Sequence, residues 1–382
     1  MASDLMADVK SFKAGLEDVV AADSSICYID GERGILSYRG IDIHALADNS
    51  TFEEVCFLLW NGRLPRREEL ADVRRAIGAE RALSGVTVQL LSQLASRLSP
   101  MDSLRTMVSA LVVTDPDAHD MTPAANRRKA IRLTGQLASL VAAHHRLGNG
   151  LAVVAPDPDL GHAEDFLRML NGSAPSAEAK RAFDVALILH ADHELNASTF
   201  AARVTAATLS DIHSAITSAI GTLKGPLHGG ANEAVMKMLL EIRSLDRVDE
   251  FIHAKLARKE KIMGFGHRVY HTEDPRATHL REMSKALAES SGETRWYDMS
   301  RRIEKLINEE KKLNSNVDFY SASVYFMLGI PMELFTPIFA VSRVCGWTAH
   351  VLEQYEHNRL IRPRAEYVGP EYPQPYVPIE KR

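Results

Sequence analysis

Helical patterning runs through almost all of this 382-residue sequence, and it limits the fold more than any other feature. The one strand signal comes early, where Ser25–Ile29 and Ile35–Tyr38 flank a glycine-containing turn, which is typical of a β-hairpin. Strands and helices do not alternate, so a doubly wound sheet is not expected. We predict a mainly α fold with a short N-terminal β-hairpin. Apolar residues recur at helical spacing at about 67–79, 83–97, 101–114, 122–145, 176–192, 196–209 and 211–222.

Local signals mark where some helices begin and end. Ser50 followed by Glu53 predicts a capping box, and Leu64-Pro65 ends the helix that starts there. Residues 147–162 contain several glycines and prolines and predict an irregular connection.

The second half of the chain changes in character twice. Residues 240–312 carry dense charge, whereas the sequence becomes apolar again from about residue 317. This change predicts a smaller, more polar helical unit that interrupts the main helical one. The tail at 367–382 contains four prolines, so we expect it to form an extended arm.

Composition places the chain among ordinary globular proteins. Hydrophobic residues make up 46% and charged residues 25%, and a net charge of −5 gives no reason to expect a nucleic-acid partner. No apolar run approaches the ~18 residues that a membrane helix needs. The three cysteines lie far apart, and the N-terminus carries acids where a signal peptide has basic residues. We therefore expect a cytoplasmic protein without a membrane segment.

A histidine stands among glycines in the stretch Gly225–Glu233, after one helical segment and before another. Glycines allow positive φ and the close approach of a ligand. The next helix begins there, so its free N–H groups face the same space. His228 is thus placed to contact a reacting atom, and an ordinary helix-to-helix turn is the alternative.

Two further positions have the character of catalytic residues. His267 lies in a second glycine-flanked turn, and Arg276 follows it nine residues later with the bidentate geometry that carboxylates prefer. Asp318 begins an apolar helix beside Val317 and Phe319. Burial there would raise the pKa of its carboxyl, as suits a catalytic base. The alternative role for Asp318 is a helix cap.

Other polar residues need an explanation as well. Arg343 lies amid the apolar positions 335–351 and requires a partner if it is buried. The cluster of His190, Asp192, His193 and Glu194 is compatible with a zinc hydrolase. Its spacing is H-x-x-H-E, which matches neither helical zinc signature, so no metal is expected.

Together these motifs resemble the citrate synthases, in particular the short bacterial and archaeal type. One departure is His271, where relatives commonly have lysine, and it lies outside the catalytic set. The matching segments follow one another through nearly the whole chain: Tyr38–Asp42, Ala191–Glu194, Gly225–Glu233, Lys261–Arg276, Asn316–Tyr320, Phe335–Arg343, Gly346–His350 and Arg362-Pro363.

The resemblance implies an acyltransferase of the tricarboxylic acid cycle that needs no cofactor and no metal. It would condense acetyl-CoA with oxaloacetate and hydrolyse citryl-CoA to citrate and CoA. Asp318 would take a proton from the acetyl methyl group, His228 would stabilise the enol, and His267 would polarise the oxaloacetate carbonyl. A base and an oxyanion donor acting together suit a weakly acidic thioester α-proton. The residues implied to hold oxaloacetate are His193, Arg276, Arg343 and Arg362.

The resemblance also implies two domains and a homodimer with shared active sites. Residues 1–230 and 322–382 would form a large helical domain with the dimer contacts and the oxaloacetate site. Residues 231–321 would form a small helical domain on the CoA side of the cleft. Arg362 would reach the oxaloacetate of the neighbouring subunit. The candidates for binding the CoA phosphates, each with a solvated helix face as its alternative role, are Arg258, Lys261, Arg268 and Lys312.

Two alternative functions stay open. A non-enzymatic helical scaffold would not require His228, His267 and Asp318 each in its motif. A 2-methylcitrate synthase uses propionyl-CoA on the same fold, and such enzymes tend to have alanine at the position of Val317 and histidine at that of Ser321. The β-branched Val317 beside Asp318 favours acetyl-CoA, because it fills space that an extra methyl group needs.

Overall fold

The computed structural model describes residues 13–17 and 19–382, so the acidic start of the chain lies outside the described residues. The chain divides into two units. We call Ser24–Arg359 the helical unit, and we call the residues up to Asp23 together with Leu360–Arg382 the terminal unit. Within the described part of the terminal unit, the regular elements are the 3-10 turns Ala14–Leu16 and Ile379–Lys381.

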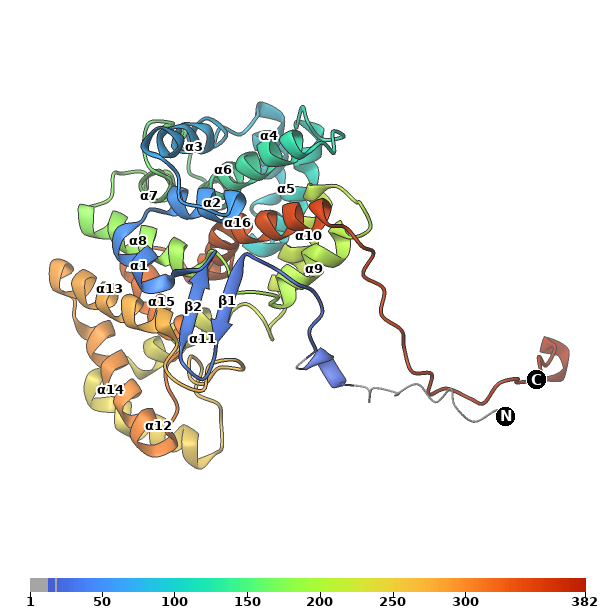
Figure 1. Ribbon diagram of the computed structural model, residues 1–382. Coiled ribbons are helices and arrows are strands. Elements are labelled where there is room, and N and C mark those ends of the chain that lie inside the picture. The colour runs from blue at the N-terminus through green and yellow to red at the C-terminus, as the bar shows by residue number, and fades with distance from the viewer. Residues whose placement is uncertain (1–12, 18) are drawn as a thin grey trace. The chain divides into compact units, whose positions relative to one another are not determined.

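The helical unit confirms the prediction of a mainly α fold (Figure 1). Its α-helices are α1 (Ile43–Asn49), α2 (Phe52–Asn61), α3 (Arg67–Ala79), α4 (Gly85–Leu94), α5 (Pro100–Ala110), α6 (Pro123–Gly148), α7 (His162–Asn171), α8 (Ala177–His190), α9 (Ala197–Ala206), α10 (Ile212–Leu223), α11 (Ala231–Ile242), α12 (Val248–Ala257), α13 (Pro275–Ser291), α14 (Arg295–Lys311), α15 (Val317–Met327) and α16 (Phe335–Glu356).

The predicted β-hairpin is confirmed, with one additional strand. Strands β1 (Cys27–Asp30) and β2 (Ile35–Tyr38) pair antiparallel, with Cys27 opposite Tyr38. The two-residue strand β3 (Ile41–Asp42) pairs antiparallel with β2 and completes the order β1-β2-β3. The strand signal therefore marks a small three-stranded sheet, which packs against α1.

The predicted capping box at the start of α2 is wrong by one residue. Thr51 caps the helix, because its side chain accepts the N–H of Glu54. Glu53 is buried instead, and its carboxylate accepts the N–H of His162 at 2.8 Å. A carboxylate used for that long-range contact is not available to close a capping box.

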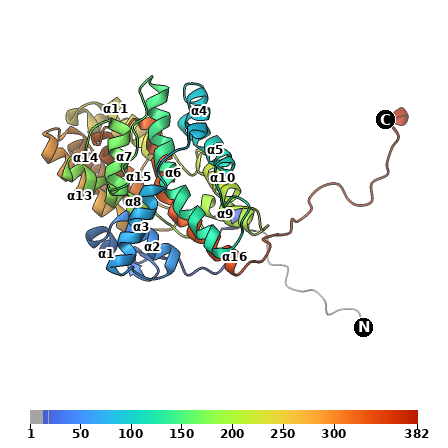
Figure 2. The same ribbon diagram turned by 90° about the horizontal axis from the view of Figure 1, so that it is seen from above.

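Helix α16 lies at the centre of the helical unit. It packs against α2, α5, α6, α8, α9 and α10, and Figures 1 and 2 show it side by side with the long helix α6. Both helices are buried along most of their length. Arg343 therefore lies in the middle of the core.

Helices α11 to α15 form a second group of contacts. Helix α15 packs against α11, α13 and α14, and α12 packs against α14. Figure 1 shows α11, α12, α13 and α14 gathered on one side of the helical unit. Helices α13 and α15 also contact α8. The domain boundaries at 231 and 321 remain a prediction.

Candidate active site

Most of the predicted site residues come together in the helical unit. His193 lies in the α8–α9 loop, His228 in the α10–α11 loop and His267 in the loop before α13, while Arg276, Asp318 and Arg343 lie on α13, α15 and α16. Burial is the main influence on the pKa of His193, His228 and Asp318, and the charge of Arg343 acts on all three. Arg362 belongs to the terminal unit and its side chain is exposed.

His228 presents one ring nitrogen for a ligand. Its Nε2 lies 2.8 Å from Oγ of Ser198 and accepts the backbone N–H of Ser198 at 3.3 Å. The ring proton therefore sits on Nδ1. Burial, followed by the charge of Arg343, lowers the pKa of His228 to about 4. At pH 7 this histidine is a neutral hydrogen-bond donor.

Glycines shape the loop that carries His228, as the sequence predicts. Gly230 has a φ of 96° and precedes α11, a conformation that glycine adopts without strain. A Cβ at Gly229 would lie 2.4 Å from the carbonyl oxygen of Leu223. The loop is therefore closely fitted to the end of α10, which fixes the direction of the imidazole.

In His267 the proton lies on the other ring nitrogen than in His228. Its Nδ1 accepts the backbone N–H groups of Val269 and Tyr270 at 3.0 and 3.2 Å, so Nε2 carries the proton. Burial, followed by the charge of Arg276, lowers the pKa of His267 to about 4. The ring of His193 lies beside it, with centroids 5.4 Å apart, and two neutral imidazoles stand together.

Asp274 joins Arg276 to the helix that carries Asp318. Oδ1 of Asp274 accepts Nε–H of Arg276 at 2.9 Å, and Oδ2 accepts its Nη2–H at 2.8 Å. Oδ2 also accepts the backbone N–H of Val317 at 3.1 Å. Among the described residues, Nη1 of Arg276 has no hydrogen-bond partner, so one donor group of this buried cation is left for a ligand.

Asp318 does not cap its helix, so that alternative is wrong. Asn316 is the cap of α15, and its side chain accepts the N–H of Asp318 at 3.0 Å. The carboxylate of Asp318 has no hydrogen-bond partner within the described part of the chain. Burial raises its pKa to about 6, against the opposing effect of Arg276. It is ionised at pH 7 and suited to accept a proton.

A short backbone bridge sets the distance between His267 and Asp318. Phe265 pairs antiparallel with Ser315. The N–H of Gly266 donates to the carbonyl of Asn314 at 3.0 Å, and the N–H of Asn316 donates to that of Gly264 at 2.9 Å. His267 follows one side of this bridge and Asp318 follows the other. The two predicted catalytic groups are therefore held by one rigid element.

Arg343 is a buried cation that has no carboxylate partner among the described residues. Its side chain is 1% exposed, its Nε donates to the carbonyl of His190 at 2.7 Å, and its guanidinium lies 4.5 Å from the ring centre of Phe339. Its two terminal nitrogens have no hydrogen-bond partner among the described residues. Such a charge is costly to bury alone, and burial lowers the pKa of Arg343. A bound anion would offset that cost.

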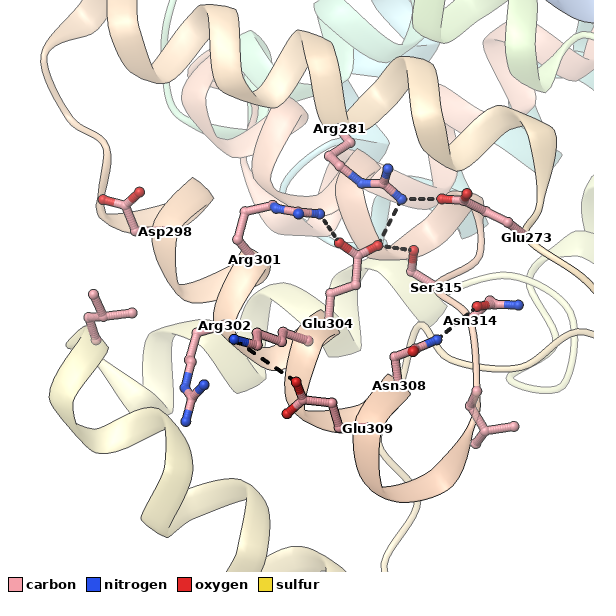
Figure 3. Close-up of a pocket in the computed structure, with 13 residues that line it drawn as sticks. Glu273, Arg281, Asp298, Arg301, Arg302, Glu304, Asn308, Glu309, Asn314 and Ser315 are labelled. Atoms are coloured by element: carbon pink, nitrogen blue, oxygen red, sulfur yellow. Dashed lines mark hydrogen bonds and ion pairs between the residues drawn. The ribbon is translucent and has the colours of Figure 1, made fainter.

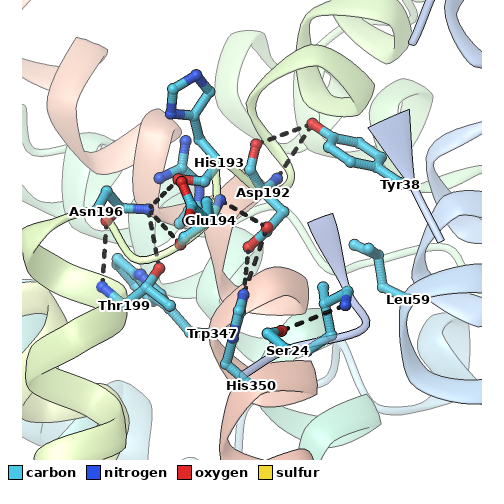
Figure 4. Close-up of polar contacts among 12 residues, drawn as sticks. Ser24, Tyr38, Leu59, Asp192, His193, Glu194, Asn196, Thr199, Trp347 and His350 are labelled. Carbon is cyan, nitrogen blue, oxygen red and sulfur yellow. Dashed lines mark hydrogen bonds and ion pairs between the residues drawn. The ribbon is translucent and has the colours of Figure 1, made fainter. Parts of the chain in front are cut away.

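Buried polar contacts hold the loop that carries His193 (Figure 4). The carboxylate of Asp192 lies 3.3 Å from Nε2 of His350 on α16 and accepts the N–H of Glu194 at 3.1 Å. The carbonyl of Asp192 accepts the hydroxyl of Tyr38 at 3.0 Å. The central helix and the β-sheet thus fix His193 from two sides.

The residues of the possible zinc cluster serve other purposes. His190 is fully buried in α8, where its Nδ1 lies 2.7 Å from the carbonyl of Ala186. In the part of the chain that the structure describes, no group of three or more His, Cys, Asp or Glu side chains is arranged to hold a metal ion. That part also contains no helix with the length and apolarity to cross a membrane.

A pocket of about 560 Å³ adjoins the site. Of the four predicted CoA-phosphate residues only Lys261 lines it, and Lys259, Lys311 and Asn316 line the same pocket. Arg258 pairs with Glu260 instead, with Nε 2.5 Å from Oε1. Arg268 and Lys312 are exposed, and their role in phosphate binding stays a prediction.

Sequence reasoning missed Ser198, Asp274, Lys259 and Lys311. An Asp-Pro pair before an amphipathic segment signals a helix start, and Asp274 is indeed the N-cap of α13. No pattern indicates that the same carboxylate binds Arg276 and Val317. Lys259 follows Arg258 and Lys311 precedes Lys312, and both of those neighbours were predicted to bind the CoA phosphates. A search of the sequence for clusters of cations would have found the two lysines.

Comparison with known proteins gives matches within a single family. A family model described as citrate synthase, C-terminal domain, matches residues 15–364. Citrate synthase 2 of Bacillus subtilis (strain 168) is 56% identical over 369 residues, covering 96% of this chain and 98% of the relative. A 2-methylcitrate synthase of Shewanella oneidensis is 42% identical over 379 residues, covering 99% of this chain and 100% of the relative.

Solved structures agree with the sequence comparison. The crystal structure of citrate synthase from Pyrobaculum aerophilum matches with a TM-score of 0.90 and 44% identity, over 96% of this chain and 95% of that one. The citrate synthase of Thermoplasma acidophilum was solved as a ternary complex with carboxymethyl coenzyme A and oxaloacetate. It matches with a TM-score of 0.90 and 33% identity, over 97% of this chain and 100% of that one.

Proposed function

The chain belongs to the citrate synthase family, and we propose that the cluster around His228, His267 and Asp318 is its active site. The enzyme condenses acetyl-CoA with oxaloacetate and hydrolyses citryl-CoA to give citrate and CoA. The observation that carries the assignment is the meeting of Asp318, a carboxylate without a partner, with two buried arginines that keep donors free, Arg276 and Arg343. A base beside an anion-binding group is what this condensation requires.

Oxaloacetate is an anion with two carboxylates and one ketone. Nη1 of Arg276 and the terminal nitrogens of Arg343 are free to bind carboxylate oxygens. The ring of His193 lies beside that of His267, and Nε2–H of His267 is free to donate to the ketone oxygen. A hydrogen bond to that oxygen draws electron density from the carbon that is attacked.

Acetyl-CoA supplies the attacking carbon. Asp318 removes a proton from the methyl group and becomes a carboxylic acid, while Nδ1–H of His228 donates to the thioester oxygen on which charge develops. The resulting enolate carbon forms a bond to the ketone carbon of oxaloacetate as the ketone π bond opens. The ketone oxygen takes a proton from Nε2–H of His267 and becomes a hydroxyl, and His267 regains a proton from solvent. Water then cleaves the thioester of citryl-CoA, which releases citrate and CoA. Neutral histidines suit both donor roles, because a pKa of about 4 keeps each ring uncharged at pH 7.

The coenzyme fits the pocket beside the site. Lys259, Lys261 and Lys311 offer positive charge to its phosphates, and Asn316 at the same pocket lies two residues before Asp318. A long anionic ligand with its phosphates at the lysines would therefore extend toward the base. We keep Arg258, Arg268 and Lys312 as further phosphate candidates that closure of the site would bring into use.

Three broader features complete the proposal. Residues 231–321 act as a small domain that closes on the large domain, residues 1–230 and 322–382, and excludes water from the enol. The enzyme is a homodimer in which Arg362 contributes to the site of the neighbouring subunit. The three cysteines are free thiols, which is consistent with a cytoplasmic location.

Replacing the proposed base or electrophile tests the site directly. Asp318→Asn and His267→Ala should each lower kcat at least ~10²-fold in steady-state CoA release, the usual scale for such roles. His253→Ala is the matched control, since His253 is exposed and pairs with the surface residue Glu310 at 2.6 Å, and it should keep wild-type turnover. Near-normal kcat in a folded Asp318→Asn enzyme would sink the assignment.

The second candidate function is 2-methylcitrate synthesis, because a relative of that name matches over 99% of this chain. The two acyl groups differ by one methylene, which a hydrophobic pocket discriminates by only ~1–3 kcal/mol, or about 10–200-fold. Val317 is 4% exposed beside Asp318 and favours the smaller group. We expect a higher kcat/KM for acetyl-CoA in competition assays at limiting thioester, and a propionyl preference would reassign the enzyme.

A further inference from the structure

The carboxylate of Glu304 accepts hydrogen bonds from four side chains, which lie on α13, α14, α15 and the loop before α15. Glu304 lies on α14 in the wall of a pocket of about 700 Å³ (Figure 3), and its side chain is only 14% exposed. Oε1 accepts Nη2–H of Arg281 at 2.9 Å and the hydroxyl of Ser315 at 2.8 Å. Oε2 accepts the hydroxyl of Tyr320 at 2.7 Å and a hydrogen bond from Nη1 of Arg301.

Most charged side chains that line the pocket are paired within the protein, and Asp298 accepts the hydroxyl of Thr294 at 2.7 Å. Arg302 pairs with Asp249 across the pocket wall, and Lys305 lies 4.0 Å from Glu309. Arg281 pairs with Glu273 as well as with Glu304. What distinguishes this region is therefore the buried carboxylate and not a binding surface.

Two of the four donors flank the proposed catalytic base. Ser315 stands three residues before Asp318 and Tyr320 stands two residues after it, and they are 2% and 0% exposed. Ser315 is also the partner of Phe265 in the bridge that leads to His267. Nothing in the described part of the chain donates a hydrogen bond to the carboxylate of Asp318, so its position depends on the backbone on either side.

We propose that Glu304 is a positioning residue for Asp318, because it holds the backbone on both sides of the base through Ser315 and Tyr320. The proposal rests on the role of Asp318 in the proposed function. Proton transfer requires the base within hydrogen-bond reach of the methyl group, and a displacement of ~1 Å costs about 10²-fold in rate. Loss of the Glu304 contacts slows proton abstraction while leaving the oxaloacetate site intact.

Glu304→Gln changes this junction with little change in size. The amide replaces one acceptor oxygen by an N–H₂ donor, and in either orientation that donor faces Arg281 or Arg301. Tyr320→Phe is a milder variant that removes one donor and keeps the other three. Glu309→Gln is the matched control, because Glu309 lies on the same helix and lines the same pocket with 58% of its side chain exposed.

The experiment compares kcat, KM for oxaloacetate and the primary deuterium isotope effect on kcat with trideuterated acetyl-CoA. Glu304→Gln should lower kcat by about 10-fold to 10²-fold, raise the isotope effect, and leave KM for oxaloacetate within about twofold. Tyr320→Phe should change kcat and the isotope effect in the same direction by less. Glu309→Gln should match wild type in all three. A purely structural role would lower thermal stability without raising the isotope effect.

The outcomes separate this proposal from the assignment of the base. Asp318→Asn is measured alongside, and if it keeps turnover the proposed function itself fails. If Asp318→Asn is inactive while folded Glu304→Gln or Tyr320→Phe keeps the wild-type kcat and isotope effect, only the role of Glu304 is overturned. If Glu304→Gln does not fold, Tyr320→Phe decides the question.

Discussion

The ionised carboxylate of Asp318 lowers the free energy of unfolding of the protein. Burial raises its pKa from an ordinary 3.8 to about 6, so the folded chain binds this proton more tightly than the unfolded chain does. By linkage, the ionised group lowers the free energy of unfolding as pH rises from about 4 through 6. Below pH 4 both states hold the proton and the effect disappears.

Asp318→Asn should therefore give an inactive but more stable protein. One pKa unit corresponds to about 1.4 kcal/mol, and partial exposure reduces the effect, so we expect a gain of roughly 1–3 kcal/mol at pH 8. At pH 4 the variant and the wild type should have nearly equal stability. Urea unfolding at both pH values measures the difference. A variant less stable than wild type at pH 8 contradicts the burial argument.

At the scale of single residues, the sequence reveals the reacting groups better than the residues that hold them. His228, His267 and Asp318 stand in motifs whose glycines and apolar neighbours can be recognised locally. Ser198 acts on His228 across 30 residues, and Asp274 reaches Val317 across 43 residues. Such contacts exist only once the helices have packed, so short-range patterns do not carry them.

Among the elements, the β1–β2 hairpin has a role beyond its size. Its turn residue Gly31 accepts the N–H of His271 at 3.0 Å, and a Cβ at Gly31 would lie 1.9 Å from the carbonyl oxygen of Val269. Val269 in turn donates its N–H to His267. The hairpin therefore braces the loop that sets which nitrogen of His267 is protonated.

Gly31→Ala should disturb that loop. The added methyl group has to displace the backbone at Val269 and weaken the contacts to Nδ1 of His267, so we expect a higher KM for oxaloacetate and a fall in kcat of at least ~10-fold. Gly85→Ala is the matched control, because a Cβ at Gly85 meets no atom within 4 Å. Steady-state kinetics of both variants provide the test, and wild-type kinetics in Gly31→Ala would show that the hairpin is not a brace.

Helices with a regular apolar stripe were predictable from the sequence, and those with an interrupted stripe were not. The predicted segment 67–79 coincides with α3, where the apolar stripe is regular. Helix α7 was not predicted, because buried polar residues interrupt its pattern: Asp165 is fully buried and pairs with Arg81 at 2.6 Å. Helix α1 has seven residues and depends on burial against its neighbours, since short helices are unstable alone.

For the whole molecule, the proposed homodimer makes each active site a product of two chains. Mixing Arg362→Ala with Asp318→Asn under subunit exchange should restore activity, because each hybrid dimer holds one site with both native residues. Random 1:1 exchange in a two-fold symmetric dimer recovers about a quarter of wild-type activity. Labelled subunits verify the exchange. Proven exchange without recovered activity would refute shared sites.

Domain boundaries and assembly are the features that sequence physics describes least. The charged stretch 240–312 marks the region of α12 to α14, but composition alone does not place a hinge. An interface between copies also uses ordinary surface residues, whose patterns resemble those of any solvated helix. These expectations came from family resemblance, and for that reason they remain proposals.

The buried guanidinium of Arg343 has a consequence for the life of the protein in the cell. Any dicarboxylate that binds its free nitrogens stabilises the folded chain over the unfolded one, by about 2.7 kcal/mol when its concentration is 100 times Kd. Proteases act on the unfolded fraction. The abundance of the enzyme would then follow the supply of oxaloacetate. A shortage of this metabolite would lower the amount of folded enzyme in the cell as well as the rate of each enzyme molecule.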